Sequence, residues 1–244
     1  RLDSVILTIG DGLAVSRVRH REELEDRYII PYIHADLMQK LADKADFYTM
    51  CDKYGIRHPK TVVLDAPAEA DTLTADKLGF AYPIIVKPSS SIDYWHHPFD
   101  GMKKVYTADT PAEAAQIVAE IYNAGYTERM ILQDRIEGTD ANMRVLTAYV
   151  GKDGKVKMMC LGHVLLEEHT PKGLGNHAAI ITEYNPELTA KFRALLEAIG
   201  YRGFANFDIK YDDRDGTLNV FEINLRQGRS NYYITSSGLN IAKY

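Results

Sequence analysis

Two carboxylates and one carboxamide lie on neighbouring segments near the C-terminal end of the sequence. Asp208 belongs to the stretch NFDIK, and Glu222 and Asn224 belong to the stretch FEIN. Both stretches alternate polar and apolar residues, as half-buried strands do, and the DDRDG run between them is typical of a hairpin turn. The hairpin is expected to bring Asp208 opposite Glu222 and Asn224. Clustered oxygen ligands suit Mg²⁺, usually shared with substrate phosphates; the alternative is the solvated face of an edge hairpin.

A lysine ends a second apolar run. Lys87 follows IIV and precedes a proline and three serines. An ammonium group at the mouth of a buried strand can contact a phosphate, and the hydroxyls and amides of Ser89 and Ser90 can wrap the remaining oxygens. The segment is not a Walker A motif, and the sequence contains no GxGxxG. A lysine that merely ends a strand is the alternative.

A third feature is the segment 130–140, in which an apolar strand leads through a polar joint into Gly138. Such a joint can offer amides and carbonyls to the edge of a nucleobase. Asp140, just beyond it, can accept hydrogen bonds from ribose hydroxyls. A simple strand–turn–strand connection is the alternative.

The composition sets the class of protein that carries these features. The 244 residues are 45% hydrophobic and 26% charged, which excludes a disordered or fibrous chain. The net charge of −5 gives no general attraction to nucleic acid or to an anionic membrane. Nothing at the start resembles a signal peptide, and no apolar run is long enough to cross a bilayer, so we expect a cytoplasmic protein. Cys51 and Cys160 are too few for a disulfide scaffold and are expected to be buried thiols.

The elements of the first part follow from periodicity and from breaking residues. Pro31 divides a helical region over 21–55, and Gly55 is expected to end its second helix. Thr110, Pro111 and Glu113 form an N-cap, a first helical position and a capping box. The sequence predicts strands at 4–9, 61–64, 82–86, 103–107 and 130–134, helices at 66–78 and 111–123, and a loop at 89–101.

The pattern changes near Gly138. Alternating strands are predicted at 142–150 and 155–163, a helix at 186–199, and strands at 205–211 and 217–223. The order is a small α+β block followed by a larger antiparallel sheet with a helix. The chain has no initiator Met and ends without a helix stop signal, so we expect it to be a piece of a longer enzyme.

These motifs, in this order, resemble the ATP-grasp superfamily over residues 37–244. The matching residues are Lys44 in ADK, Lys87 in IIVKP, the joint 133–140 and the acidic hairpin. The resemblance implies an α+β fold in which two lobes clamp a nucleotide. Residues 1–36 would be the remnant of a preceding α/β domain, 37–137 a linker helix with the N-lobe, and 138–244 the C-lobe with the metal hairpin.

The resemblance also implies roles for single residues, with ATP and Mg²⁺ as cofactors. Lys44 and Lys87 would contact the phosphates, together with Ser89 and Ser90 of a loop that lacks the usual glycines. In the joint, which includes Asp134, Gln133 stands where Glu is common and would accept from the adenine amino group. The remaining implied contacts are the Ile136 amide to a ring nitrogen, Asp140 to the ribose, and Asp208, Glu222 and Asn224 to one or two Mg²⁺.

Within the superfamily, the run EINLRQGRSNYY looks most like carboxylate–amine ligases of the D-aspartate ligase type. Such enzymes join an amino acid to an amine, in that case a peptidoglycan lysine. A carboxylate would attack the γ-phosphate of ATP, and an amine would displace phosphate from the acyl phosphate. Arg226 would act in the acyl-phosphate region, because a guanidinium suits carboxylates and phosphates. Lys172, in a loop, and Arg144, expected to share a strand face with Asp140, are further catalytic candidates.

Three other readings stay open. One is an enzyme of the same fold that activates bicarbonate, like a carboxylase or a carbamoyl-phosphate-forming enzyme. Another is an ATP-binding fragment without activity of its own, and a third is a structural peptidoglycan-associated module. Beyond ATP, a carboxylate and an amine acceptor, the expected partners include a second copy of the chain in a homodimer, and exclude nucleic acid.

Overall fold

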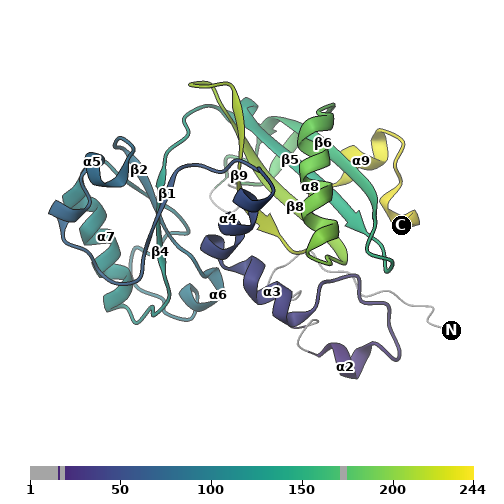
Figure 1. The fold of residues 1–244 in the computed structure, drawn as a ribbon, viewed down its shortest axis with the longest axis horizontal. Helices are drawn as coiled ribbons and strands as arrows, with labels where there is room; N and C mark the ends of the chain where they lie inside the picture. Colours follow the sequence, from purple (N-terminus) through teal and green to yellow (C-terminus); the bar gives the residue numbers. More distant parts are fainter. Residues whose placement is uncertain (1–15, 17–19, 171–174) are drawn as a thin grey trace. The chain divides into compact units, whose positions relative to one another are not determined.

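The computed structural model describes residue 16, residues 20–170 and residues 175–244 (Figure 1). Its contacts divide the chain into two compact units. Unit 1 comprises Arg1–Ala42, Thr49–Arg57 and Gly138–Tyr244, and unit 2 comprises Asp43–Tyr48 and His58–Glu137. The predicted strand 4–9 lies outside the described residues, and the assignment of 1–36 to a preceding domain remains a prediction. No described helix has the length and apolar character needed to span a membrane.

Unit 2 is built on a four-stranded antiparallel sheet in the order β1-β4-β2-β3. Helix α7 packs on it through Ala114, Ile117, Val118 and Ile121, which recur at helical spacing and are all buried. The opposing core side chains come from β2 and β4. The strands are β1 (Thr61–Leu64), β2 (Ile84–Pro88), β3 (Tyr106–Ala108) and β4 (Met130–Asp134), and the helices are η1 (Ala70–Thr72), α5 (Ala75–Leu78), α6 (Ser91–Tyr94) and α7 (Pro111–Asn123).

The start of α7 confirms the predicted cap at Thr110 with one difference. Thr110 Oγ1 accepts from the Glu113 N–H at 3.2 Å, and Pro111 is the first helical residue. The Glu113 carboxylate accepts from the N–H of Asp109 at 2.8 Å rather than from that of Thr110. The reciprocal bond of the predicted capping box is therefore displaced by one residue.

Two local predictions for unit 2 are wrong. The segment 66–78 forms only η1 and α5 instead of one helix, since Pro67 disfavours helical geometry at Ala66 and only Leu73 and Leu78 of the segment are buried. The predicted loop 89–101 contains the short helix α6, whose N-cap Ser90 accepts a hydrogen bond from the Asp93 N–H.

Unit 1 is built on a five-stranded antiparallel sheet in the order β7-β6-β5-β8-β9. Helix α8 supplies the buried Phe192, Leu195 and Leu196, and the Phe192 ring centroid lies 4.4 Å from that of Phe207. Both units thus have the predicted α+β character. The strands are β5 (Met143–Val150), β6 (Val156–Glu167), β7 (His177–Glu183), β8 (Gly203–Asp212) and β9 (Thr217–Asn224).

The helices of unit 1 differ in part from the prediction. The region 21–55 forms three helices instead of two, α2 (Arg21–Leu24), α3 (Ala35–Ala42) and α4 (Lys44–Lys53), of which α4 begins in unit 2. Gly55 follows α4 at φ +62°, as predicted for a residue that ends a helix. Neither β7 nor α9 is predicted by the sequence pattern. The remaining helices are η2 (Asp140–Asn142), α8 (Pro186–Ala198), α9 (Tyr232–Ser236) and η3 (Ile241–Lys243).

Gly203, the first residue of β8, permits a close backbone contact. It has φ +85°, and a Cβ there would lie 1.8 Å from the carbonyl oxygen of Pro31. Gly55 also has a positive φ, but a Cβ there would meet nothing within 4 Å.

We expect Gly203→Ala to lower the free energy of unfolding by about 3 kcal/mol, from strain and overlap together. Gly55→Ala should lower the free energy of unfolding by only about 1 kcal/mol. Urea denaturation of both variants measures the difference. Equal losses would show that the close contact with Pro31 does not explain why residue 203 is glycine.

Candidate functional site

The β8–β9 pairing brings the three predicted oxygen ligands together on one face. Asp208 lies directly opposite Glu222, and Asn206 lies opposite Asn224. Asn224 Nδ2 donates a hydrogen bond to Asp208 Oδ2 at 3.0 Å. The three side chains of the predicted metal group are all half-buried. The hairpin therefore presents two carboxylates and an amide as one group, as the alternation in the sequence predicts.

A bulge lies beside this group. The register shifts after Asp208, so that Ile209 pairs with Val220 and Phe221 becomes the additional residue of β9. Phe207 and Ile223 are buried on the face opposite the carboxylates, as the alternation of the two stretches predicts. Alternation would also bury Phe221, but this residue is half-buried, because the bulge interrupts the alternation of β9.

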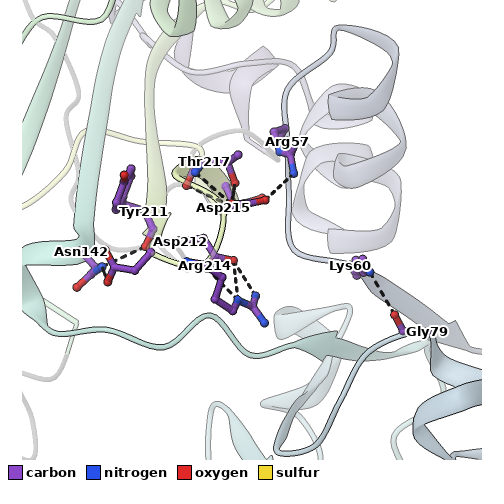
Figure 2. Close-up of polar contacts among 11 residues, drawn as sticks. Arg57, Lys60, Gly79, Asn142, Tyr211, Asp212, Arg214, Asp215 and Thr217 are labelled. Carbon is purple, nitrogen blue, oxygen red and sulfur yellow. Dashed lines mark hydrogen bonds and ion pairs between the residues drawn. The ribbon is translucent and has the colours of Figure 1, made fainter.

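The turn at the far end of the hairpin is held by charged side chains (Figure 2). Arg214 donates to Asp212 through Nε at 2.9 Å and Nη2 at 2.7 Å, which holds the pKa of the Asp212 carboxyl below its usual value. Arg57 Nη2 lies 3.0 Å from Asp215 Oδ2, and Asp215 Oδ1 accepts from the Thr217 N–H at 3.1 Å. These contacts hold the turn that joins β8 to β9.

Arg226, predicted to act in the acyl-phosphate region, contacts the same group. Its Nη2 donates to Asn224 Oδ1 at 3.3 Å, and its Nη1 donates to the Gln227 carbonyl at 3.1 Å. Arg229, by contrast, is exposed and donates to Asn176 Oδ1 at 3.3 Å. Of the two arginines that follow β9, Arg226 is thus the one that contacts the predicted metal group.

A buried polar network of Thr147, Asn206 and Asn231 packs against the loop that follows β9, and it was not predicted from the sequence. Thr147 Oγ1 lies 2.8 Å from Asn206 Oδ1 and 3.2 Å from Asn231 Oδ1, and the buried Asn231 Nδ2 has no partner among the described residues. Because a threonine hydroxyl has one proton, it donates to only one of these oxygens. Turning the Asn231 amide over lets its Nδ2 donate to Thr147, whose hydroxyl then donates to Asn206. Asn206 could have been found from its spacing, two residues before Asp208; Thr147 and Asn231 carry no such signal.

Gly228 packs tightly on this network. A Cβ at Gly228 would lie 2.7 Å from both Asn206 Oδ1 and Asn231 Oδ1. The loop after β9 therefore packs so closely on the two amides that a side chain at residue 228 would overlap them.

Asp140 lies among polar groups at the end of β6. Its Oδ2 accepts from the Glu167 N–H at 2.9 Å and contacts His169 Nε2 at 2.8 Å. The amide of Glu167 first, and the His169 imidazole second, hold the pKa of Asp140 below its usual value. Asp140 is thus a charged acceptor, which suits its predicted role toward hydroxyl groups.

The structure does not bring Arg144 to the carboxylates. Asp208 pairs with Val145, whereas Arg144 pairs with Ile209, so Arg144 lies on the opposite face of the sheet. Arg144 Nε donates to Glu183 Oε2 at 2.5 Å. Lys172, the other predicted catalytic cation, lies outside the described residues.

In unit 2 the structure brings Lys87 to Gln133. Lys87 Nζ donates to Gln133 Oε1 at 3.0 Å and to the Tyr48 hydroxyl at 3.1 Å, and Lys87 and Gln133 are both buried. The antiparallel pairing of β2 with β4 places these two side chains on neighbouring strands. Farther along the joint, Asp134 donates its N–H to the Lys60 carbonyl at 2.9 Å, and Ile136 is buried.

Lys44 and the predicted phosphate-binding serines also lie together. Lys44 Nζ donates to Ser91 Oγ at 3.0 Å, and the Lys44 N–H donates to the Ser89 carbonyl at 3.3 Å. Ser89 Oγ accepts from the Ala45 N–H at 3.3 Å, while Ser90 caps α6. The first residues of α4 thus hold the serine segment beside the Lys44 ammonium.

The oxygen set of the hairpin fits Mg²⁺ better than a transition metal. No group of three or more histidine, cysteine or acidic side chains in the described ranges is arranged to hold a metal ion. Asp208 and Glu222 supply two carboxylates and Asn224 supplies an amide oxygen. Mg²⁺ is commonly held by one or two carboxylates and completed by water and substrate phosphates.

Burial of His177 predicts a pH dependence of stability. Burial lowers the pKa of His177 below its ordinary value of 6.5. The unfolded chain therefore binds this proton more readily, and stability falls as the pH drops through 6.5 toward the lowered value. His177→Gln should lose less stability than the parent chain between about pH 7.5 and pH 5.5, as measured by urea denaturation midpoints. The exposed His96→Gln is the control, and a pH slope unchanged by His177→Gln would contradict the assignment.

Comparison with known proteins adds to this geometry. No family model matches the chain. It is 44% identical over 240 residues to a D-aspartate ligase of Enterococcus faecium (strain Aus0004), which covers 98% of this chain and 57% of that protein. The chain thus spans a little over half the length of this curated relative.

Two solved structures resemble the fold. The biotin carboxylase domain of the Hydrogenobacter thermophilus 2-oxoglutarate carboxylase, in complex with MgADP, ADP and bicarbonate, superposes with a TM-score of 0.71 at 16% identity, covering 98% of this chain and 52% of that one. D-alanine–D-alanine ligase from Bacillus anthracis, complexed with ATP, gives a TM-score of 0.60 at 16% identity, covering 93% of this chain and 71% of that one.

Proposed function

The chain has the ATP-grasp fold and is a homologue of D-aspartate ligase, and on that premise we propose that it serves an ATP-dependent carboxylate–amine ligase. The carboxylate of the acyl donor attacks the γ-phosphate and releases ADP, and an amine then attacks the acyl phosphate and releases phosphate. D-Aspartate is the proposed donor, and the proposed acceptor is the side-chain amine of a peptidoglycan lysine, which would give a cell-wall cross-bridge. The arrangement of Asp208, Glu222 and Asn224 on one face carries the proposal.

Asp208, Glu222 and Asn224 would hold Mg²⁺, with Glu222 as the bridging carboxylate if two ions bind. Mg²⁺ supplies charge neutralisation on the β- and γ-phosphates. The chain's own contribution is orientation: Asn224 Nδ2 donates to Asp208, so the Asn224 carbonyl oxygen is the end that would bind a cation, in place of the hydrogen bond it now accepts from Arg226. Arg226, in contact with that same oxygen, would bind the acyl phosphate.

The nucleotide would contact residues that unit 2 holds rigidly. Lys44 and Lys87 would bind phosphate oxygens, and both ammonium groups are already oriented by hydroxyl partners. Asp140, which is a charged acceptor, remains the predicted partner of the ribose. The other proposed contacts are Ser89 and Ser90 to phosphate, and Gln133, Asp134 and Ile136 of the joint to adenine.

Lys172 and Arg144 remain predicted contacts to substrate. Arg144 donates to Glu183, so it would have to exchange that carboxylate for a ligand. A cytoplasmic location and a homodimer likewise remain predictions from the sequence.

We expect the chain to form ADP and an aspartyl hydroxamate from Mg·ATP, D-aspartate and hydroxylamine, a small amine that intercepts acyl phosphates. Glu222→Gln should lower this rate by about 100-fold or more, since a metal ion supplies several kcal/mol of charge stabilisation. Asp215→Asn, at the far end of the same hairpin, is the matched control. Equal rates for the two variants would contradict the role of the metal group.

Bicarbonate activation is the second candidate, favoured by the similarity to a biotin carboxylase domain. ADP release that depends on bicarbonate and needs no amine would establish it in place of the ligase. Binding of Mg·ATP without any turnover would instead identify an ATP-binding segment of a longer enzyme, consistent with the share of the relative that the chain spans.

A further inference from the structure

We propose that Thr61 makes the nucleotide site select adenine, because it determines which end of the Gln133 amide faces the base. The inference rests on the proposed function, in which Gln133 meets position 6 of the purine. It adds a specificity-determining residue that itself touches no ligand.

The amide of Gln133 could serve either of two bases. Its oxygen accepts a hydrogen bond and its nitrogen donates two, while the two ends differ little in shape. The oxygen suits the 6-amino group of adenine, and the nitrogen suits the 6-oxo group of hypoxanthine or guanine. A carboxylate at this position would have no such ambiguity, so the surroundings of Gln133 must decide.

Thr61 resolves the ambiguity through the use of its single proton. Thr61 Oγ1 donates to the carbonyl oxygen of Pro59 at 2.7 Å, and a carbonyl can only accept. The hydroxyl is therefore left as an acceptor toward Gln133 Nε2, which lies 2.8 Å away. The β1–β4 register, in which Thr61 pairs with Gln133, makes the two residues direct neighbours. The amide nitrogen is thus bound to Thr61, and the oxygen is turned the other way.

A second anchor completes a closed ring of contacts. Lys87 Nζ donates to Gln133 Oε1 at 3.0 Å and to the Tyr48 hydroxyl at 3.1 Å. The Tyr48 ring stacks on His58 with centroids 4.6 Å apart, and His58 Nδ1 lies 2.9 Å from the same Pro59 carbonyl that receives the Thr61 proton. Every donor in the ring meets an acceptor only when Gln133 is in this orientation.

Lys87 and Thr61, the two residues that hold the Gln133 amide, would respond differently to a bound nucleotide. Lys87 is a proposed phosphate ligand, so a bound nucleotide offers its ammonium a second, anionic partner. Thr61 Oγ1 donates its single proton to the Pro59 carbonyl and accepts from Gln133, so it has no proton left for a phosphate oxygen. Thr61 is therefore the anchor that keeps the Gln133 oxygen available to the base.

The test is the ratio of the dissociation constants for Mg·ITP and Mg·ATP, measured by calorimetry. The bases of these two nucleotides differ only at position 6 and in the proton on N1. The parent chain should prefer ATP. Thr61→Val keeps the branched shape that suits a strand and removes the hydroxyl, and it should narrow the preference by about fivefold or more, the value of one hydrogen bond. Thr61→Ser should retain the preference, and Thr61→Ala repeats the loss if the valine variant folds poorly.

A second background separates specificity from folding. In Gln133→Glu both ends of the side chain accept, so adding Thr61→Val should leave the ITP/ATP ratio unchanged. The role of Thr61 is overturned if Thr61→Val leaves the preference for ATP intact in the parent chain. It is also overturned if Thr61→Val changes the ITP/ATP ratio by the same factor in the Gln133→Glu background. Neither result affects the proposal that the chain binds ATP. If the parent chain binds neither nucleotide, the proposed function itself fails, and the role of Thr61 fails with it.

Discussion

The pairing of Asp208 with Glu222 across β8 and β9 is the constraint on which the candidate site depends. Like charges directly opposite each other destabilise a strand pair, so the arrangement calls for compensation. The chain supplies part of it through the amide of Asn224 and, by way of that amide, through Arg226. A divalent cation bound by the two carboxylates would add to this compensation, which is one physical reason for regarding the group as a metal site. The apolar face behind it, with Phe207 packed on α8, keeps the hairpin in place regardless of the charges in front.

In unit 2 the main constraint is the burial of a positive charge. The Lys87 ammonium is buried, and burial of a charge is costly unless hydrogen bonds replace its water. Tyr48 and Gln133 provide those bonds, and the Gln133 amide is held in turn by Thr61. The same contacts that make the buried charge tolerable also orient the amide, so stability and ligand selection depend on one set of hydrogen bonds.

Alternation within single strands made much of the hairpin predictable, because a period of two decides which residues share a face. The register of Asp208 against Glu222 followed from it, but the bulge at Phe221 did not, since an additional residue breaks the period. The expectation that Arg144 shares a strand face with Asp140 is wrong for a related reason. Counting from Asp140 assumed a continuous strand, whereas η2 occupies residues 140–142 and β5 begins only afterwards. The Thr61–Gln133 contact joins residues far apart in sequence, and no local pattern encodes such a pairing.

The most direct test of the account is a calorimetric titration of ATP in the presence and absence of Mg²⁺, on the parent chain, on Asp208→Asn and on the control Asp215→Asn. The account predicts that Mg²⁺ tightens ATP binding to the parent chain and to the control. Asp208→Asn should reduce the effect of Mg²⁺ by about tenfold or more, as expected for the loss of a metal ligand. ATP binding that is equally tight with and without Mg²⁺, or a Mg²⁺ effect that survives intact in Asp208→Asn, would contradict the assignment of the hairpin as the metal site.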